Sequence, residues 1–172
     1  MLFRSGNVSV GDSVQASLDI TIGIINVAPG CNEEKLVGTV ISETISRCGA
    51  MIAECAKTNF TRDDLKDAII EMCDKGIHIV FTVGGAGISI KDNAPEAILE
   101  VVEKELPGVS DNIRRNFQKQ KDAIIFRGRA GIRGNSIIVN LPDDEKILRN
   151  SLPEILLRSE ERRVGKECRS RW

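Results

Sequence analysis

Aromatic side chains are scarce in this chain of 172 residues, which has five Phe, one Trp and no Tyr. Proteins that bind single-stranded nucleic acid stack the bases on aromatic side chains, so this composition argues against such a function. Histidine occurs once, and no two cysteines have the spacing of a zinc site, which argues against a structural metal. No apolar run approaches the ~20 residues of a membrane-spanning helix. We therefore expect neither a nucleic-acid partner nor a membrane partner.

The two ends of the chain lack the apolar periodicity of the rest. Met1–Ser5 and Arg158–Trp172 resemble the translation of sequencing-adapter DNA, and we leave both out of the fold prediction. For the second segment the alternative is a native basic tail that binds RNA or acidic lipid. Without the two segments the chain is mildly acidic, with a net charge of about −5, and has no basic face for nucleic acid. We expect a cytoplasmic protein with reduced cysteines.

Strand-like and helix-like segments alternate along the chain. The expected strands are apolar runs, namely Ile20–Val27, Met51–Cys55, Ile77–Val83, Ala123–Phe126 and Ser136–Leu141. The expected helices have apolar residues at helical spacing, and they are Glu33–Cys48, Thr61–Cys73, Ala94–Leu106, Ser110–Gln118 and a last helix from Asp143 that Pro153 breaks or kinks. This alternation predicts the α/β class, as a three-layer α/β/α sandwich with a mainly parallel sheet.

Residues Gly6–Ser17 fit this pattern poorly and read as a short β segment. We interpret them as the remnant of an upstream domain. The predicted organisation is then an end segment over 1–5, this remnant over 6–17, one α/β domain over 18–157 and an end segment over 158–172.

The strongest local signal is the glycine-rich segment Gly84–Gly87, directly after a predicted buried strand. Its glycines permit a sharp turn and a close approach of the backbone to a ligand. Free backbone N–H groups before a helix form an anion-binding site, and ligands of parallel sheets bind at the carboxyl ends of the strands. The segment is neither a P-loop nor GxGxxG, and a tight strand–helix turn without a ligand remains the alternative.

A carboxylate follows the glycines in the segment Asp92–Glu96, and Pro95 suits the first turn of a helix. The Asp92 side chain has the chemistry to hold Mg²⁺ against a phosphate or to transfer a proton. It also has the chemistry to cap the following helix. The residues alone leave both roles open.

Three ordered motifs make the sequence similar to the molybdopterin-binding family of molybdenum-cofactor biosynthesis, which includes molybdopterin adenylyltransferase. The family has Gly-Gly-Thr-Gly and then Asp-x-Thr-Pro-Glu-Ala, where this chain has GGAG and then DNAPEA (Asp92–Ala97). The second motif is Glu105–Gly108 followed by Ile113-Arg114. The third motif is Phe126-Arg127, the turn Ala130–Gly134 and the segment Ile137–Pro142 (IIVNLP). The resemblance runs from roughly Ile20 to Leu157.

This resemblance implies binding of molybdopterin and of ATP with Mg²⁺, transfer of AMP to the terminal phosphate of the pterin, and a homotrimer. It implies that Asp92 is the catalytic residue and a ligand of Mg²⁺. The positions that it assigns to pterin and nucleotide binding are Gly84, Gly85, Ala86, Gly87, Ser89, Pro95, Glu96, Arg127, Asn140 and Pro142.

Several polar residues of the family are absent. Ala86 and Ala94 replace threonines, Lys57-Thr58-Asn59 stands where the enzymes carry an acidic residue, and Asp143-Asp144-Glu145 replaces Gly-Ser-Pro. Each hydrogen bond lost to a charged phosphate is worth roughly 1.5–3 kcal/mol. Three hypotheses therefore stay open: an active adenylyltransferase, a non-catalytic pterin-binding or assembly domain of a larger fused protein, and a relative with another pyrophosphate-bearing substrate.

Overall fold

The computed structural model describes residues 20–27, 33–58, 61–117 and 124–169. The predicted segment Gly6–Ser17 lies outside these residues. In chain order the elements are β1 (Thr21–Asn26), α1 (Glu33–Arg47), β2 (Met51–Lys57), α2 (Arg62–Asp74), β3 (Ile79–Val83), α3 (Ala94–Val101), β4 (Lys104–Glu105), α4 (Pro107–Asn116), β5 (Ala130–Arg133), β6 (Ser136–Leu141) and α5 (Glu145–Arg169).

One six-stranded sheet has the order β2-β1-β3-β6-β5-β4. The strands β2, β1, β3 and β6 are parallel, whereas β5 is antiparallel to β6 and β4 is antiparallel to β5. A parallel pair needs a crossover connection, and in this chain each crossover contains at least one helix. The prediction of a mainly parallel sheet is confirmed.

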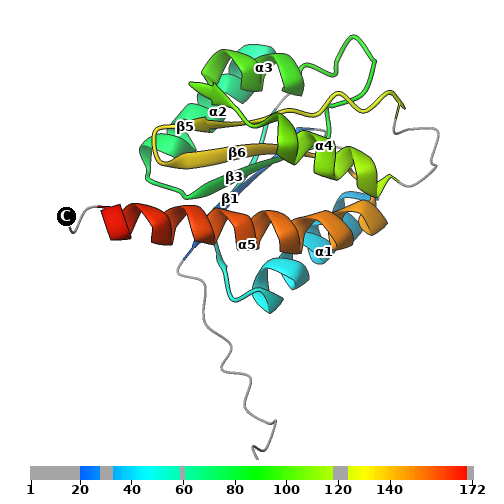
Figure 1. Ribbon diagram of the computed structural model, residues 1–172. Coiled ribbons are helices and arrows are strands. Elements are labelled where there is room, and N and C mark those ends of the chain that lie inside the picture. The colour runs from blue at the N-terminus through cyan, green and yellow to red at the C-terminus, as the bar shows by residue number, and fades with distance from the viewer. Residues whose placement is uncertain (1–19, 28–32, 59–60, 118–123, 170–172) are drawn as a thin grey trace, which may run out of the picture.

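Helices cover both faces of the sheet (Figure 1). Apolar residues of α2 and α3 pack on one face, against strand residues that include Ile25, Val80 and Ile138. Residues of α1, α4 and α5 pack on the other face, against strand residues that include Phe81 and Val139. Neighbouring strand residues thus enter opposite apolar clusters, which explains why the central strands are apolar throughout. The predicted three-layer α/β/α sandwich is confirmed.

The predicted strand Ala123–Phe126 was wrong. Ile124 is 89% exposed, and no described residue of this segment joins the sheet. Phe126 of this segment packs elsewhere, because its ring lies against the Phe117 ring with centroids 5.0 Å apart. The strand at this place in the chain is β5, over residues that the sequence motif suggested as a turn. A tight turn at Gly134, whose φ is +54°, then leads into β6.

The predicted helix Ala94–Leu106 ends early, at Val101, because tertiary pairing competes with it. Val102 is already extended, and the Glu103 N–H donates to the Ile132 carbonyl over 2.8 Å. The short strand β4 then pairs with β5 at Gly131, where a Cβ atom would lie only 2.8 Å from the Lys104 carbonyl oxygen. A glycine on the neighbouring strand therefore permits a pairing that helical periodicity does not reveal.

The last helix continues through Pro153, so of the two predicted effects of this proline, a break or a kink, the break was wrong. Proline lacks an N–H group, and the helix therefore lacks one backbone hydrogen bond at this position. Buried residues on both sides of the proline hold α5 on the sheet, among them Leu148, Leu152 and Leu156. Tertiary packing of this apolar face outweighs the local cost of the proline.

Candidate functional site

The carboxyl ends of β1, β3 and β6 lie side by side at one edge of the sheet. Asn26 is in register with Val83, and Val83 is in register with Leu141. The Gly84 N–H group donates to the Leu141 carbonyl over 3.0 Å, so the glycine loop leaves the sheet between these strand ends. The predicted location of the loop, beyond the carboxyl ends of parallel strands, agrees with the structure.

Two glycines give the loop its turn. Gly84 and Gly85 have φ values of +85° and +65°, in the left-handed region that glycine adopts without steric cost. A Cβ atom on Gly85 would lie 2.9 Å from Cγ1 of Val27 and 3.2 Å from Cβ of Ala94. A side chain at position 85 would therefore point into the protein interior. Gly85 permits close packing of the loop on Val27, which directly follows β1, and on Ala94 in α3.

Three successive carbonyl groups of the loop accept hydrogen bonds from the protein. The Gly85 carbonyl accepts from the Ala94 N–H, the Ala86 carbonyl from the Arg127 N–H, and the Gly87 carbonyl from Nε of Arg127, over 3.1, 2.9 and 2.8 Å. In a trans peptide the next N–H group points opposite to the carbonyl. The N–H groups of Ala86, Gly87 and Ile88 therefore point away from these donors. Among the described residues, none of these three N–H groups has a recorded bond to a protein acceptor, and backbone N–H groups of this kind are the ones that bind anions in other loops.

Asp92 closes the loop. Its Oδ2 atom accepts a hydrogen bond from the Ser89 N–H over 2.8 Å, and a Cβ atom on Gly87 would lie 2.7 Å from the same oxygen. The residue at the N-cap position of α3 is Asn93, so the alternative role of Asp92 as the cap of that helix was wrong. The carboxylate instead lies against the glycine loop, within the candidate anion site.

Arg127 lies behind the loop and is half-buried. Nε donates to the Gly87 carbonyl over 2.8 Å, and Nη2 donates to the Asp92 carbonyl over 2.8 Å. Nη1 donates to Oε1 of Glu96 on α3. Burial by itself raises the pKa of Glu96, but the hydrogen bond from Arg127 and the nearby positive charges outweigh burial and hold the pKa below its ordinary value. Glu96 is therefore ionised at neutral pH and fixes the guanidinium.

Asn140 on β6 holds the start of the loop by a hydrogen bond to the Gly84 carbonyl. It is completely buried, and Nδ2 donates to both oxygens of Thr82 and to the Gly84 carbonyl. Its Oδ1 atom has no hydrogen-bond partner, and neither has the buried Oγ1 atom of Thr58 at the end of β2. Pro142 is buried where β6 ends. Unpaired buried polar atoms at this edge are costly unless a water or a ligand completes them.

The structure therefore brings the predicted site residues together. Gly84, Gly85, Ala86, Gly87, Ser89, Asp92, Glu96 and Arg127 belong to one network of contacts, with Asn140 beneath it and Pro95 in the first turn of α3. The sequence did not single out the pairing of Arg127 with Glu96, because the two residues lie 31 positions apart. Only the polar character of both positions hinted at it.

Ala86 faces inward. It is 5% exposed and joins the apolar cluster on the α1, α4 and α5 face. A side chain at this position therefore points toward the core, and the absence of a hydroxyl here does not remove a group from the open side of the loop. Ala94, at the other position without the family threonine, is likewise completely buried.

The acidic segment after β6 serves the last helix. Oδ1 of Asp144 accepts a hydrogen bond from the Ile147 N–H over 3.0 Å, as an N-terminal cap does. His78 lies at the opposite edge of the sheet, where Nδ1 accepts a hydrogen bond from the Thr21 N–H over 3.1 Å. Neither residue reaches the glycine loop by any contact that the structure records among its described residues.

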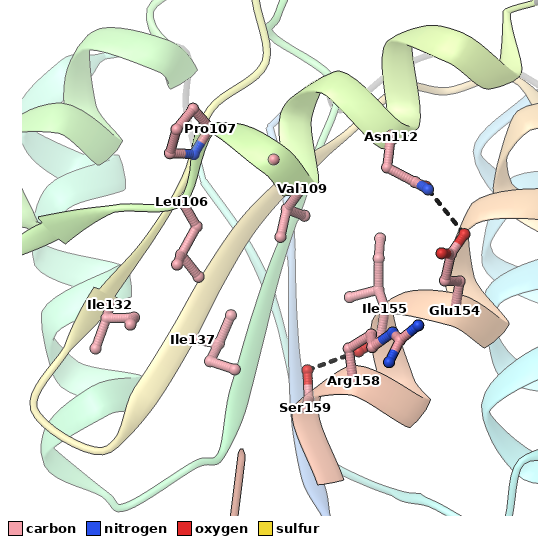
Figure 2. A pocket seen from close by; sticks show the side chains of 11 residues that line it. Leu106, Pro107, Val109, Asn112, Ile132, Ile137, Glu154, Ile155, Arg158 and Ser159 are labelled. Carbon is pink, nitrogen blue, oxygen red and sulfur yellow. Dashed lines mark hydrogen bonds between the residues drawn. The ribbon is translucent and has the colours of Figure 1, made fainter. Parts of the chain in front are cut away.

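A cavity of about 420 Å³ lies at the opposite edge from the loop, between α4, α5 and the β5–β6 hairpin. Its lining includes Leu106, Ile132, Ile137 and Ile155, and Asn112 donates to Glu154 across the rim over 2.8 Å (Figure 2). None of the predicted site residues lines this cavity. It is therefore separate from the candidate site.

The donor set at the loop limits which cation it can hold. Among the described residues, no group of three or more His, Cys, Asp or Glu side chains is placed to hold a metal ion. Mg²⁺ is commonly bound by one or two carboxylates together with substrate phosphates and waters. Asp92 supplies one carboxylate of that kind at the loop. In the part of the chain that the structure describes, no helix is long and apolar enough to cross a membrane.

The fold and the loop define an α/β/α domain with an anion-binding loop at the carboxyl ends of its parallel strands. The family described as "Probable molybdopterin binding domain" matches residues 8–159. The chain belongs to this family of molybdenum-cofactor biosynthesis.

Two curated relatives resemble parts of the chain. Molybdopterin adenylyltransferase of Helicobacter pylori strain J99 is 38% identical over 96 residues, which are 55% of this chain and 54% of that protein. The molybdenum cofactor synthesis protein cinnamon of Drosophila melanogaster is 31% identical over 145 residues, which are 79% of this chain and 24% of that protein. The chain thus spans about half the length of the adenylyltransferases that it matches.

Solved structures share the fold. The molybdopterin biosynthesis enzyme MoaB from Thermus thermophilus superposes with a TM-score of 0.71 at 27% identity, over 80% of this chain and 89% of that chain. A molybdopterin biosynthesis protein from Mycobacterium abscessus superposes with a TM-score of 0.73 over 87% of this chain and 99% of that chain. At 22% identity the second structure supports the fold alone.

Proposed function

We propose that this chain binds molybdopterin through its phosphate at the loop Gly84–Gly87 and transfers AMP from ATP to that phosphate. The observation that carries the proposal is the set of three N–H groups, of Ala86, Gly87 and Ile88, that point away from the donors holding their carbonyls. Hydrogen bonds to a charged acceptor are worth about 1.5–3 kcal/mol each, so three of them give a phosphate substantial affinity.

The negative charge of Asp92 beside the loop bears on how a phosphate binds there. Its carboxylate lies against Gly87 and accepts the Ser89 N–H, so a second anion beside it meets electrostatic repulsion. A Mg²⁺ ion held by Asp92 would neutralise the charge of the phosphates. We therefore include Mg²⁺ in the proposal, with Asp92 as its protein ligand.

The proposed reaction is a nucleotidyl transfer. An oxygen of the pterin phosphate attacks the α-phosphorus of ATP, and a new P–O bond forms. The bond from the α-phosphorus to the bridging oxygen breaks, and pyrophosphate leaves with the electron pair. The protein contributes by positioning, because the loop N–H groups fix the attacking phosphate and lower the entropic cost of the encounter.

A second candidate function is a non-catalytic pterin-binding or assembly domain of a longer protein. The exposed Lys57 at the end of β2, where the enzymes carry an acidic residue, favours it. The match to cinnamon also favours it, because the chain covers only 24% of that protein. The resemblance additionally supports a cytoplasmic homotrimer, and sedimentation velocity at several concentrations tests that state.

A paired assay separates the two candidates. Molybdopterin affinity and AMP transfer are measured for the wild type, for Asp92→Asn and for the control Asp111→Asn, which changes an exposed carboxylate on α4. Asparagine keeps an oxygen that can accept the Ser89 N–H, so the loop should persist while the charge is lost. We expect AMP transfer to collapse in Asp92→Asn, and pterin affinity to survive in both variants.

Equal transfer rates in the wild type and Asp92→Asn would show that Asp92 has no catalytic role. Pterin binding without transfer in the wild type would favour the non-catalytic domain. Absence of pterin binding in the wild type would refute both candidates.

A further inference from the structure

The guanidinium of Arg127 directs its donors at the protein. Arginine has five N–H donors in a planar fork. Here all three nitrogens donate to protein acceptors, namely the carbonyls of Gly87 and Asp92 and the carboxylate of Glu96. The backbone N–H of the same residue donates to the Ala86 carbonyl. A single residue thus contacts the beginning of the loop, its end and the helix that follows.

These contacts fix the direction of the loop's own donors. The backbone N–H of residue 127 holds the Ala86 carbonyl and the Arg127 side chain holds the Gly87 carbonyl, so the trans peptides turn the N–H groups of Gly87 and Ile88 to the opposite side. Without the side-chain bond, nothing among the described contacts would hold the peptide plane between Gly87 and Ile88 in this orientation, whereas the bond to the Ala86 carbonyl does not depend on the side chain. The peptide that follows Gly84 is fixed differently, by Asn140.

We propose that Arg127 is a positioning residue, which Glu96 orients and which aims the loop N–H groups at the substrate phosphate without contacting that phosphate itself. This inference deepens the proposed function and depends on it for the identity of the ligand. It also revises the role that the sequence resemblance implied for Arg127, which was direct binding of pterin or nucleotide.

The two roles differ in what the free protein shows. A positioning residue holds the loop in the absence of ligand, so its loss must loosen the loop in the free protein. A direct ligand leaves the free loop unchanged and contributes only when the phosphate is present. The bonds in the free protein use three of the five N–H donors of Arg127, one on each nitrogen, and they hold the guanidinium plane against the loop, which favours the first role.

Amide hydrogen exchange measured by NMR on the ligand-free protein tests whether Arg127 holds the loop in the absence of ligand. The reporters are the hydrogen-bonded amides of Ser89, Asp92 and Ala94. We expect them to exchange about tenfold faster in Arg127→Gln than in the wild type. The control Arg129→Gln changes an exposed arginine two residues away, whose ion pair with Glu105 spans 3.8 Å, and should leave them unchanged.

Steady-state kinetics of AMP transfer test whether the loop that Arg127 holds positions the substrate phosphate. A loop displaced by about 1 Å costs about a hundredfold in rate, so kcat should fall by that order in Arg127→Gln. Arg127→Lys should fall nearly as far, because one ammonium group cannot replace a planar fork that reaches three acceptors. Free guanidinium ion should restore part of the rate in Arg127→Ala and none in Arg129→Ala. Glu96→Gln should give a smaller loss in the same direction.

Unchanged exchange in Arg127→Gln, together with a raised KM for the pterin, would overturn the inference in favour of direct phosphate contact. Unchanged exchange with unchanged kinetics would overturn it as well. If the wild type binds neither molybdopterin nor pyrophosphate, the proposed function is wrong. The part of this inference that concerns a substrate phosphate then fails with it. The exchange comparison then still decides whether Arg127 holds the loop.

Discussion

Replacement of Gly85 by alanine tests the packing of the glycine loop directly. Two costs add at this position. The φ of +65° is a left-handed conformation, which costs an L-residue roughly 1–2 kcal/mol. The new Cβ atom would also lie 2.9 Å from Cγ1 of Val27 and 3.2 Å from Cβ of Ala94, an overpacking worth about 1–3 kcal/mol. We therefore expect Gly85→Ala to lower the free energy of unfolding by about 2–5 kcal/mol.

Two other glycines provide matched controls. Gly134 has a φ of +54° but no atom within 4 Å of a Cβ position, so Gly134→Ala should show the conformational cost alone, about 1–2 kcal/mol. Gly38 lies in α1 with the same open space, and Gly38→Ala should stabilise by about 0.5–1 kcal/mol.

Urea unfolding followed by far-UV circular dichroism gives the three differences from the midpoints, provided that the slopes agree. The total stability of a domain of this size is about 5–15 kcal/mol, so the largest expected loss leaves a folded protein in most of that range. Equal losses for Gly85→Ala and Gly134→Ala would refute the close contact of the loop with Val27 and Ala94.

Three further outcomes follow from the structure. Ala86→Thr should lower stability by about 1–3 kcal/mol without improving pterin affinity, because position 86 is buried in the core; a gain in affinity from binding calorimetry would contradict this placement. The lowered pKa of Glu96 means that its pair with Arg127 stabilises the fold above the unfolded pKa of about 4.3 and that this contribution disappears as the pH falls through the folded pKa. The difference in melting temperature between wild type and Glu96→Gln should therefore be constant near neutral pH and shrink in acid, and a difference that grows in acid would reverse the sign of the argument. Removal of residues 1–5 and 158–172 should change the melting temperature by no more than a few degrees, and calorimetry that shows a larger fall would mean that an end segment packs on the core.

The position of the candidate site could be predicted from the sequence because it depends on local features. Glycines after a strand, followed by an aspartate and a proline before a helix, give a loop whose conformation is set within a dozen residues. Buried strands are recognisable in the sequence as apolar runs, and the carboxyl ends of parallel strands must meet at one edge of the sheet. The loop Gly84–Gly87 and the place of Asp92 beside it follow from these rules.

Roles within the site depended on contacts between distant segments. Asp92 had two alternative roles in the sequence. The structure contradicts the helix cap, because Asn93 stands at the N-cap position and the Asp92 carboxylate accepts the Ser89 N–H, while the role toward Mg²⁺ stays a prediction. Arg127 looked like a phosphate ligand, yet its donors reach backbone carbonyls and Glu96 on another element. The sequence carries no record of which acceptor lies nearest to a long, flexible side chain.

The sequence by itself determined the α/β class, the parallel centre of the sheet and the place of the glycine loop, because hydrophobic periodicity and glycine conformation act over short stretches of chain. Only the tertiary structure decided that β4 and β5 pair where a longer helix and a turn were expected, and that α5 continues past Pro153. In these places the local preference is worth about 1–3 kcal/mol, and the burial of several apolar side chains or the pairing of a strand outweighs it. The free energy of these contacts depends on segments that are distant in the sequence, so it cannot be assessed from local sequence patterns.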